Sequence, residues 1–81
     1  MEWVPETKAA RLLAIYFRLS DGEVLNKDAA AEAYRVSPRS IQRDIEILRW
    51  FLAQKKPSQK IVSDRAAQGY RLEDSSASGP E

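Results

Sequence analysis

Polar side chains with the chemistry of base and phosphate recognition lie close together between residues 37 and 43. They are Ser37, Arg39, Ser40, Gln42 and Arg43. Arginine can donate two hydrogen bonds to guanine, and glutamine can pair through two hydrogen bonds with adenine, both in the major groove of DNA. Serine hydroxyls and the amides at a helix start can bind phosphates. The same side chains on an arbitrary helix more often only solvate its outer face, so their context decides between the two interpretations.

The pattern around these residues predicts a helix that would hold them on one side. Ser37 is a good N-cap residue, and Pro38 suits the first helical position because its missing N–H costs nothing there. At roughly 100° per residue, the apolar side chains form one face and the polar ones the opposite face. The apolar face holds Ile41, Ile45, Leu48 and Leu52, and the polar face holds Arg39, Gln42, Arg43 and Glu46. One face is expected to pack and the other to be presented to a partner.

Charge is distributed unevenly along the 81 residues, although the formal net charge is only +1. Residues 35–71 carry nine Lys and Arg against three Asp and Glu, a net charge of +6. The remaining residues carry four Lys and Arg against nine Asp and Glu, a net charge of −5. A basic half of this kind indicates a polyanion as the partner.

Two shorter helices are expected before this one. Apolar periodicity predicts the first over residues 6–20, opened by Pro5 and Thr7, with Leu13 and Phe17 on a flanking strip outside its core stripe. Residues 23–25 form a short extended segment that is expected to add to a small sheet. Asn26 is expected to cap a second helix over residues 27–34, and a turn at residues 35–36 joins it to the third helix, which ends near residue 53 or 54.

A β-hairpin is expected to follow the helices, with strands at residues 60–64 and 70–72 around a turn that closes on Gly69. The fold class is therefore mainly α with a small β-hairpin: a winged helix-turn-helix of three helices and a two-stranded wing. Phosphate contacts are expected from Ser37, Ser40, Lys55, Lys56 and Lys60, and Arg65 and Gln68 near the wing tip are expected to reach the minor groove. Residues 1–73 are expected to form one domain, and residues 74–81 a flexible tail or linker.

Composition removes most other classes of function. The chain has no cysteine and no histidine, so zinc sites, thiol nucleophiles and the commonest general base are lacking, and we expect neither an enzyme nor a cofactor. The first residues do not resemble a secretory signal, and no apolar run approaches the roughly 20 residues of a membrane span. These features favour a cytoplasmic, nucleoid-associated protein, and no small-molecule site is expected in this segment.

Residues 11–13, 31–37, 38–48 and 69–72 resemble the DeoR-type winged-helix domain, above all the N-terminal DNA-binding domain of bacterial WYL-domain transcription regulators. The similarity covers about residues 9–73. The pattern V-S-x-R-[ST]-I-x-R-D-I-x-x-L is long and specific, whereas the closing G-Y-x-L is weak by itself. Two positions depart from the family: Ala30 stands where leucine is usual, and Arg35 where the turn often has glycine.

The resemblance implies a bacterial regulator of transcription that places its third helix in the major groove of double-stranded DNA and usually works as a dimer. Ser37, Arg39, Ser40, Gln42 and Arg43 match groove-facing and phosphate-facing positions. Asp44 matches an aspartate nearer the core, which is expected to pair with a neighbouring arginine. The family's regulators continue into a ligand-sensing domain, so either an excised domain or a small stand-alone regulator is expected.

Exposed apolar side chains leave an alternative open. One small core cannot bury all of the large apolar side chains, and five remain: Trp3, Leu13, Phe17, Ile47 and Phe51. Winged helices also serve as protein-interaction or dimerisation modules. Either Ile47 and Phe51 meet the hairpin, or Trp3, Leu13 and Phe17 form a patch that supports a weak homodimer. RNA binding is less favoured, because only Trp50 is interleaved with the basic residues, and it is expected to be a partly buried packing residue.

Overall fold

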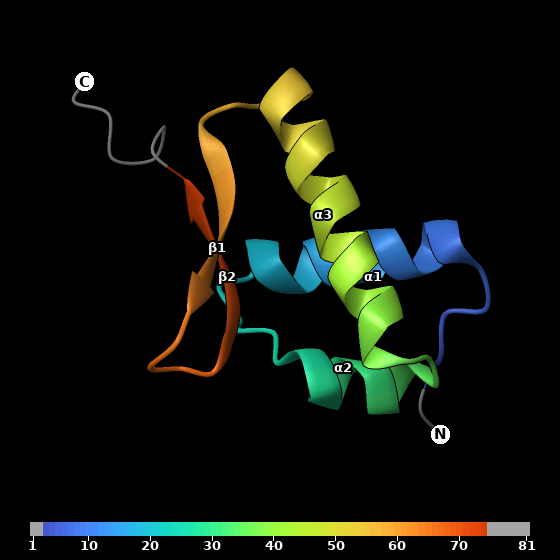
Figure 1. Cartoon of the computed structure of the whole chain (residues 1–81). Helices are drawn as coiled ribbons and strands as arrows, with labels where there is room; N and C mark the ends of the chain where they lie inside the picture. Colours follow the sequence, from blue (N-terminus) through green and yellow to red (C-terminus); the bar gives the residue numbers. More distant parts are fainter. Residues whose placement is uncertain (1–2, 75–81) are drawn as a thin grey trace.

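A computed structural model describes residues 3–74 as three helices followed by a hairpin. The helices are α1 (Lys8–Ser20), α2 (Lys27–Tyr34) and α3 (Pro38–Lys55), and the antiparallel strands are β1 (Gln59–Asp64) and β2 (Gly69–Asp74). In Figure 1, α3 crosses in front of α1, α2 lies below both, and the hairpin stands to one side. The predicted fold class is confirmed as mainly helical with a small hairpin, and the layout is compatible with a winged helix-turn-helix.

Two of the three helices, α2 and α3, begin directly after the residue that the sequence predicts as their cap. The side chains of Thr7, Asn26 and Ser37 accept hydrogen bonds from main-chain amides three residues later, at 3.0, 2.8 and 3.2 Å. These bonds satisfy donors that have no partner within the helix. The boundaries differ slightly from expectation: α1 begins at Lys8 instead of residue 6, because Thr7 is its cap, and α3 continues to Lys55.

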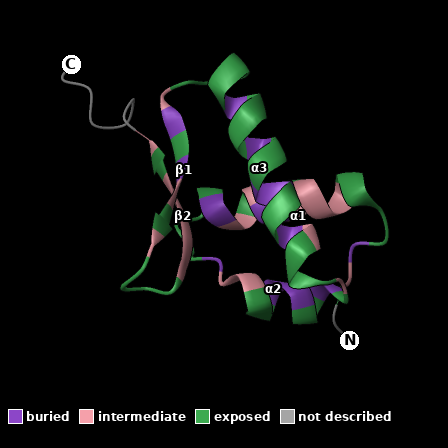
Figure 2. Cartoon of the chain, in the orientation of Figure 1, coloured by how far each residue is buried: buried purple, intermediate pink, exposed green. Residues whose placement is uncertain are grey.

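The core lies where the three helices and the hairpin meet, as the buried residues in Figure 2 show. All four members of the predicted apolar face of α3 are buried: Ile41, Ile45, Leu48 and Leu52. They pack with Ile15 and Leu19 of α1, and with Leu25, Ala30 and Tyr34. Tyr70 and Leu72 of β2 cover this cluster, as alternation along the strand predicts. This packing leaves the opposite side of α3 in solvent.

The turn between α2 and α3 depends on an unusual backbone conformation at Arg35. Its φ of 60° and ψ of 44° are left-handed, which explains why glycine suits this position. The amide of Val36 donates to the carbonyl of Ala31 at 2.9 Å and closes the end of α2. The turn therefore places α3 directly after α2, as a helix-turn-helix requires.

The hairpin is fastened to the segment before α2. Leu25 forms an isolated bridge with Tyr70 through two main-chain hydrogen bonds of 2.7 and 2.8 Å, so only the last residue of the extended segment expected at residues 23–25 joins the hairpin. Gly69 is required by this close approach, since a Cβ there would lie 2.6 Å from the carbonyl oxygen of Leu25. Asn26, while capping α2, donates from its amide to the carbonyl of Gln68 at 2.7 Å. The wing is thus held at a fixed position beside the helices.

Asp74 ends β2, and the remainder of the predicted tail, residues 75–81, lies outside the described residues. Within residues 3–74, no helix combines the length and apolar character needed to cross a membrane.

Candidate nucleic-acid interface

Arg39, Gln42, Arg43 and Glu46 are brought together on the outward face of α3. They line one shallow hollow, and all four are exposed. In the described part of the chain, none of their side chains has a hydrogen-bond or ion-pair partner. Two cations, an amide and a carboxylate can therefore bind an external ligand without first giving up an internal contact.

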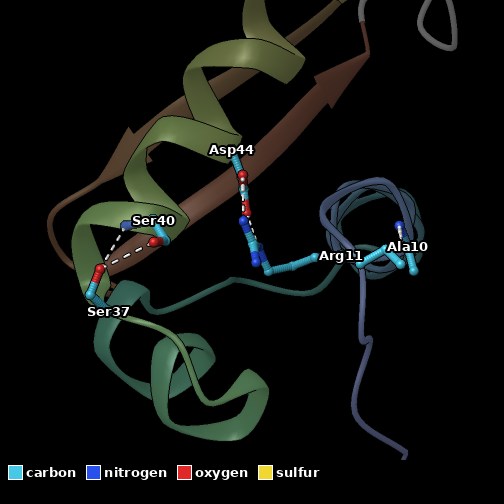
Figure 3. Close-up of polar contacts among 6 residues, drawn as sticks. Ala10, Arg11, Ser37, Ser40 and Asp44 are labelled. Carbon is cyan, nitrogen blue, oxygen red and sulfur yellow. Dashed lines mark hydrogen bonds and ion pairs between the residues drawn. The ribbon is translucent and has the colours of Figure 1, made fainter.

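The start of α3 adds hydroxyl groups next to this face. Ser37 caps the helix, and its Oγ lies 3.1 Å from the Oγ of Ser40 (Figure 3). Ser37 is exposed and Ser40 is half-buried, so both hydroxyls are close to the surface. Because the positive end of the helix dipole lies here, this end of α3 favours an anion such as phosphate.

Asp44 holds α3 against α1 from the opposite side of the helix. Its carboxylate is fully buried, and it accepts hydrogen bonds from Nε and Nη2 of Arg11, the second at 3.2 Å (Figure 3). The hydrogen bond to Asp44 raises the pKa of Arg11 above its usual value, although partial burial acts in the opposite direction. The expectation that Asp44 pairs with an arginine is confirmed, and the pair fixes which face of α3 points outward.

Other basic residues are engaged in internal contacts. Arg18 donates to Glu23 at 3.0 Å and to Tyr34 at 3.3 Å. Arg71 pairs with Asp64 across the hairpin at 3.1 Å and with Glu73 of its own strand at 3.0 Å. Their charges are partly compensated, so they contribute less to an anion-binding surface than the arginines of α3.

Arg49 also has a structural role. Its Nε donates to the carbonyl of Ile61 at 3.0 Å, and its guanidinium lies 5.7 Å from the ring centre of Tyr70. This contact joins α3 to both strands of the hairpin. Arg49 therefore positions the wing and does not extend the outward face of α3.

Three of the predicted site residues lie on the hairpin, apart from the cluster on α3. Lys60 is exposed on β1 and stands opposite Glu73 in the register. Arg65 and Gln68 are exposed in the turn, where Gln68 has a positive φ of 57°. The turn is reinforced by Asp64, whose pKa is lowered, first by the amide of Ala67 and also by Arg71.

Lys55 and Lys56 are not brought to the cluster at the start of α3. Lys55 is the last residue of α3, about 26 Å along the helix axis from Pro38 at 1.5 Å per residue. Both lysines line a groove together with apolar residues of α1 and α3. Both lysines therefore lie far from the other phosphate contacts that were predicted at the start of α3.

Sequence reasoning missed the surroundings of three apolar residues. Trp50 is 65% exposed, so its expected role as a partly buried packing residue is wrong. Ile47 and Phe51, 36% and 49% exposed, line the groove between α3 and α1 and do not pack under the hairpin. The double role of Asn26, which binds the turn of the wing, was also missed, because it depends on a contact 42 residues away.

Comparison of the chain with family models, with curated proteins and with solved structures found no match. The basis for assigning a function is therefore the geometry of α3 and the hairpin.

Proposed function

We propose that this chain binds double-stranded DNA in a sequence-specific manner and acts as a transcription regulator or as the DNA-binding part of one. The observation that carries this proposal is the outward face of α3, where Arg39, Gln42, Arg43 and Glu46 stand together without internal partners. An α-helix about 10–12 Å across fits the major groove, which is about 12 Å wide. A helix-turn-helix uses its second helix in this way.

Separate roles follow from where the side chains lie. Gln42 and Arg43, in the second turn of α3, are assigned to base edges, because their side chains form bidentate contacts with adenine and guanine. Ser37, Arg39 and Ser40, near the helix start, are assigned to phosphates and to orientation on the duplex. The hairpin would then follow the backbone beside the groove, with Lys60, Arg65 and Gln68 as its contacts.

Two observations favour DNA over the alternatives. A module that only docks another protein has no need of unpaired arginines on the outward face of α3. Recognition of single-stranded RNA relies on several exposed aromatic rings among the basic residues, and Trp50 is the only aromatic residue on this face of α3. Duplex DNA is the polyanion that fits a single exposed helix face best.

Selection of duplexes from a random oligonucleotide pool with the purified chain tests the proposal. We expect enrichment of a short motif, and affinity for the enriched duplex that falls steeply between roughly 50 and 200 mM salt as counterions are released. Arg18→Gln removes one positive charge from α1 and serves as the control for net charge, so it should retain the motif. An unenriched pool, or a flat salt response, would contradict DNA binding.

A further inference from the structure

An apolar groove of about 490 Å³ runs between α1 and α3, on the flank of α3 away from the hairpin. Leu13 and Tyr16 of α1 form one side, and Ile47, Trp50 and Phe51 of α3 form the other. Leu13 is 60% exposed, although burial of a leucine side chain away from water is favourable. A contiguous exposed apolar surface of this kind marks an interaction site.

Positive charges stand at both ends of this groove. Lys55 and Lys56 line it at the C-terminal end of α3. At the other end, Lys8 and Arg43 line an adjoining hollow that shares Ile47 and Trp50 with the groove, and Glu46 is the only acidic residue lining it. The described residues supply no ion-pair partner for any of these four cations. An occupant with apolar residues at its centre and acidic residues around them would match this surface.

We propose that the groove binds an acidic amphipathic helix of a partner protein, a function beyond DNA binding. A groove between two helices accepts the apolar stripe of a third helix, with anchors at positions i, i+3 or i+4, and i+7. Together, the adjoining hollow and the groove extend about 18 Å along α3 from Arg43 to Lys55, which corresponds to roughly 12 residues of a bound helix. Glutamate or aspartate flanking the stripe would pair with the cations at the two ends.

A second copy of this chain fits the groove less well. In a two-fold dimer, the groove of one copy would lie against the groove of the other. Because both ends of each groove are positively charged, the facing ends would repel each other. The acidic helix α2, with Asp28 and Glu32, has Tyr34 as its only large apolar residue, and that side chain is 8% exposed. Trp3, part of the patch from which a weak dimer was expected, does not line the groove.

The test uses a synthetic helical peptide of about 14 residues with leucine at i, i+3, i+4 and i+7 and glutamate between them. A matched peptide has lysine at every glutamate position. Binding to the whole chain is followed by fluorescence anisotropy of the labelled peptide, and by Trp50 emission in a Trp3→Phe background. We expect the glutamate peptide to bind at least about ten-fold more tightly than the lysine peptide, and Trp50 emission to shift to shorter wavelength.

Variants distinguish the groove from the rest of the surface. Phe51→Ser should weaken peptide binding by about ten-fold or more, and Lys55→Glu with Lys56→Glu should abolish the preference for the glutamate peptide, because only the two cations at the other end remain. Lys60→Glu, a charge reversal on the hairpin, is the matched control and should change neither result. Circular dichroism confirms that each variant keeps its helices.

Equal binding of the two peptides, or no binding of either, would overturn the proposal. A shift of Trp50 emission with increasing concentration of the chain alone, together with dimers in sedimentation that Phe51→Ser abolishes, would also overturn it and assign the groove to a second copy. DNA affinity measured on the Phe51→Ser chain keeps the two proposals separate. If Phe51→Ser abolishes peptide binding but retains DNA binding, the groove binds the peptide independently of DNA. If the unaltered chain does not bind DNA, only the proposed function of α3 is refuted.

Discussion

Arginines in this chain divide into two groups according to what surrounds the guanidinium. Arg11 and Arg18 hold ion pairs with carboxylates, whereas Arg39 and Arg43 lie on the surface of α3 without a partner in the described residues. A paired arginine has to give up that contact before it binds a phosphate or a base, and an unpaired one does not. At the scale of single residues, the proposed DNA recognition is therefore assigned to the unpaired arginines.

Substitutions in α3 should separate base reading from phosphate binding. Arg43→Ala or Gln42→Ala should lower affinity for the selected duplex by about 1–3 kcal/mol and relax the preference at one base pair, because a bidentate contact is lost. Lys60→Ala should weaken all duplexes about equally, since a phosphate contact carries no sequence information. Competition binding with single-base variants of the site measures both effects. An unchanged ranking of duplexes with Arg43→Ala would refute the assignment to base edges.

The buried pair between Arg11 and Asp44 should be important for stability. Asp44→Ala should lower the free energy of unfolding by about 3–5 kcal/mol, because it leaves a largely buried guanidinium without its partner. Glu46→Ala, two residues along on the exposed face, is the control and should change it by less than about 0.5 kcal/mol. Urea unfolding followed by circular dichroism measures both. Similar values for the two variants would show that the pair does not hold α3 in place.

Two elements depend on backbone geometry at single positions. The turn between α2 and α3 holds Arg35 in the left-handed region, and the hairpin requires Gly69 where it meets Leu25. Both positions control where α3 and the wing lie relative to one another, which decides whether they can contact the same stretch of DNA.

Arg35→Gly should raise the free energy of unfolding by about 0.5–1 kcal/mol, since glycine adopts a positive φ without steric strain. Arg35→Ala is the control: it keeps the Cβ and should give no such gain. Thermal unfolding of the three chains provides the comparison. Stabilisation by alanine equal to that by glycine would mean that loss of the charge, and not relief of strain, is responsible.

Gly69→Ala should lower the free energy of unfolding by about 1–3 kcal/mol, because its Cβ would collide with the carbonyl of Leu25. The bridge should open, so hydrogen exchange at the amides of Leu25 and Tyr70 should become faster. Ser63→Ala, at an exposed position of β1, should leave both quantities nearly unchanged. Protection of the two amides equal to that in the unaltered chain would contradict the role given to Gly69.

Features encoded by nearby residues were predicted well from the sequence. The caps at Asn26 and Ser37 act over three residues, and apolar periodicity identified the buried side of α3. Features that depend on how helices cross were not predicted. The exposure of Phe51 and the position of Lys55 beside an apolar groove follow from the way α1 packs against α3, which no local pattern reports.

At the scale of the whole molecule, α3 has different surroundings on each side. Its inner side builds the core, one flank contacts the hairpin through Arg49, the other flank lines the apolar groove with Phe51, and the outer face carries Gln42 and Arg43. The outer face and the hollow that adjoins the groove share Arg43 and Glu46, so the two proposed binding surfaces overlap there and separate only towards Lys55.

A thermodynamic cycle on one contact tests DNA recognition by α3 most directly. In the selected duplex, 7-deazaguanine replaces, one at a time, each guanine that the motif requires, which removes the N7 acceptor in the major groove. With the unaltered chain, one replacement should cost about 1 kcal/mol or more, because it removes half of a bidentate arginine contact. With Arg43→Ala, the same replacement should cost nothing. An equal cost for both chains at every guanine would contradict the claim that Arg43 reads a base from the major groove.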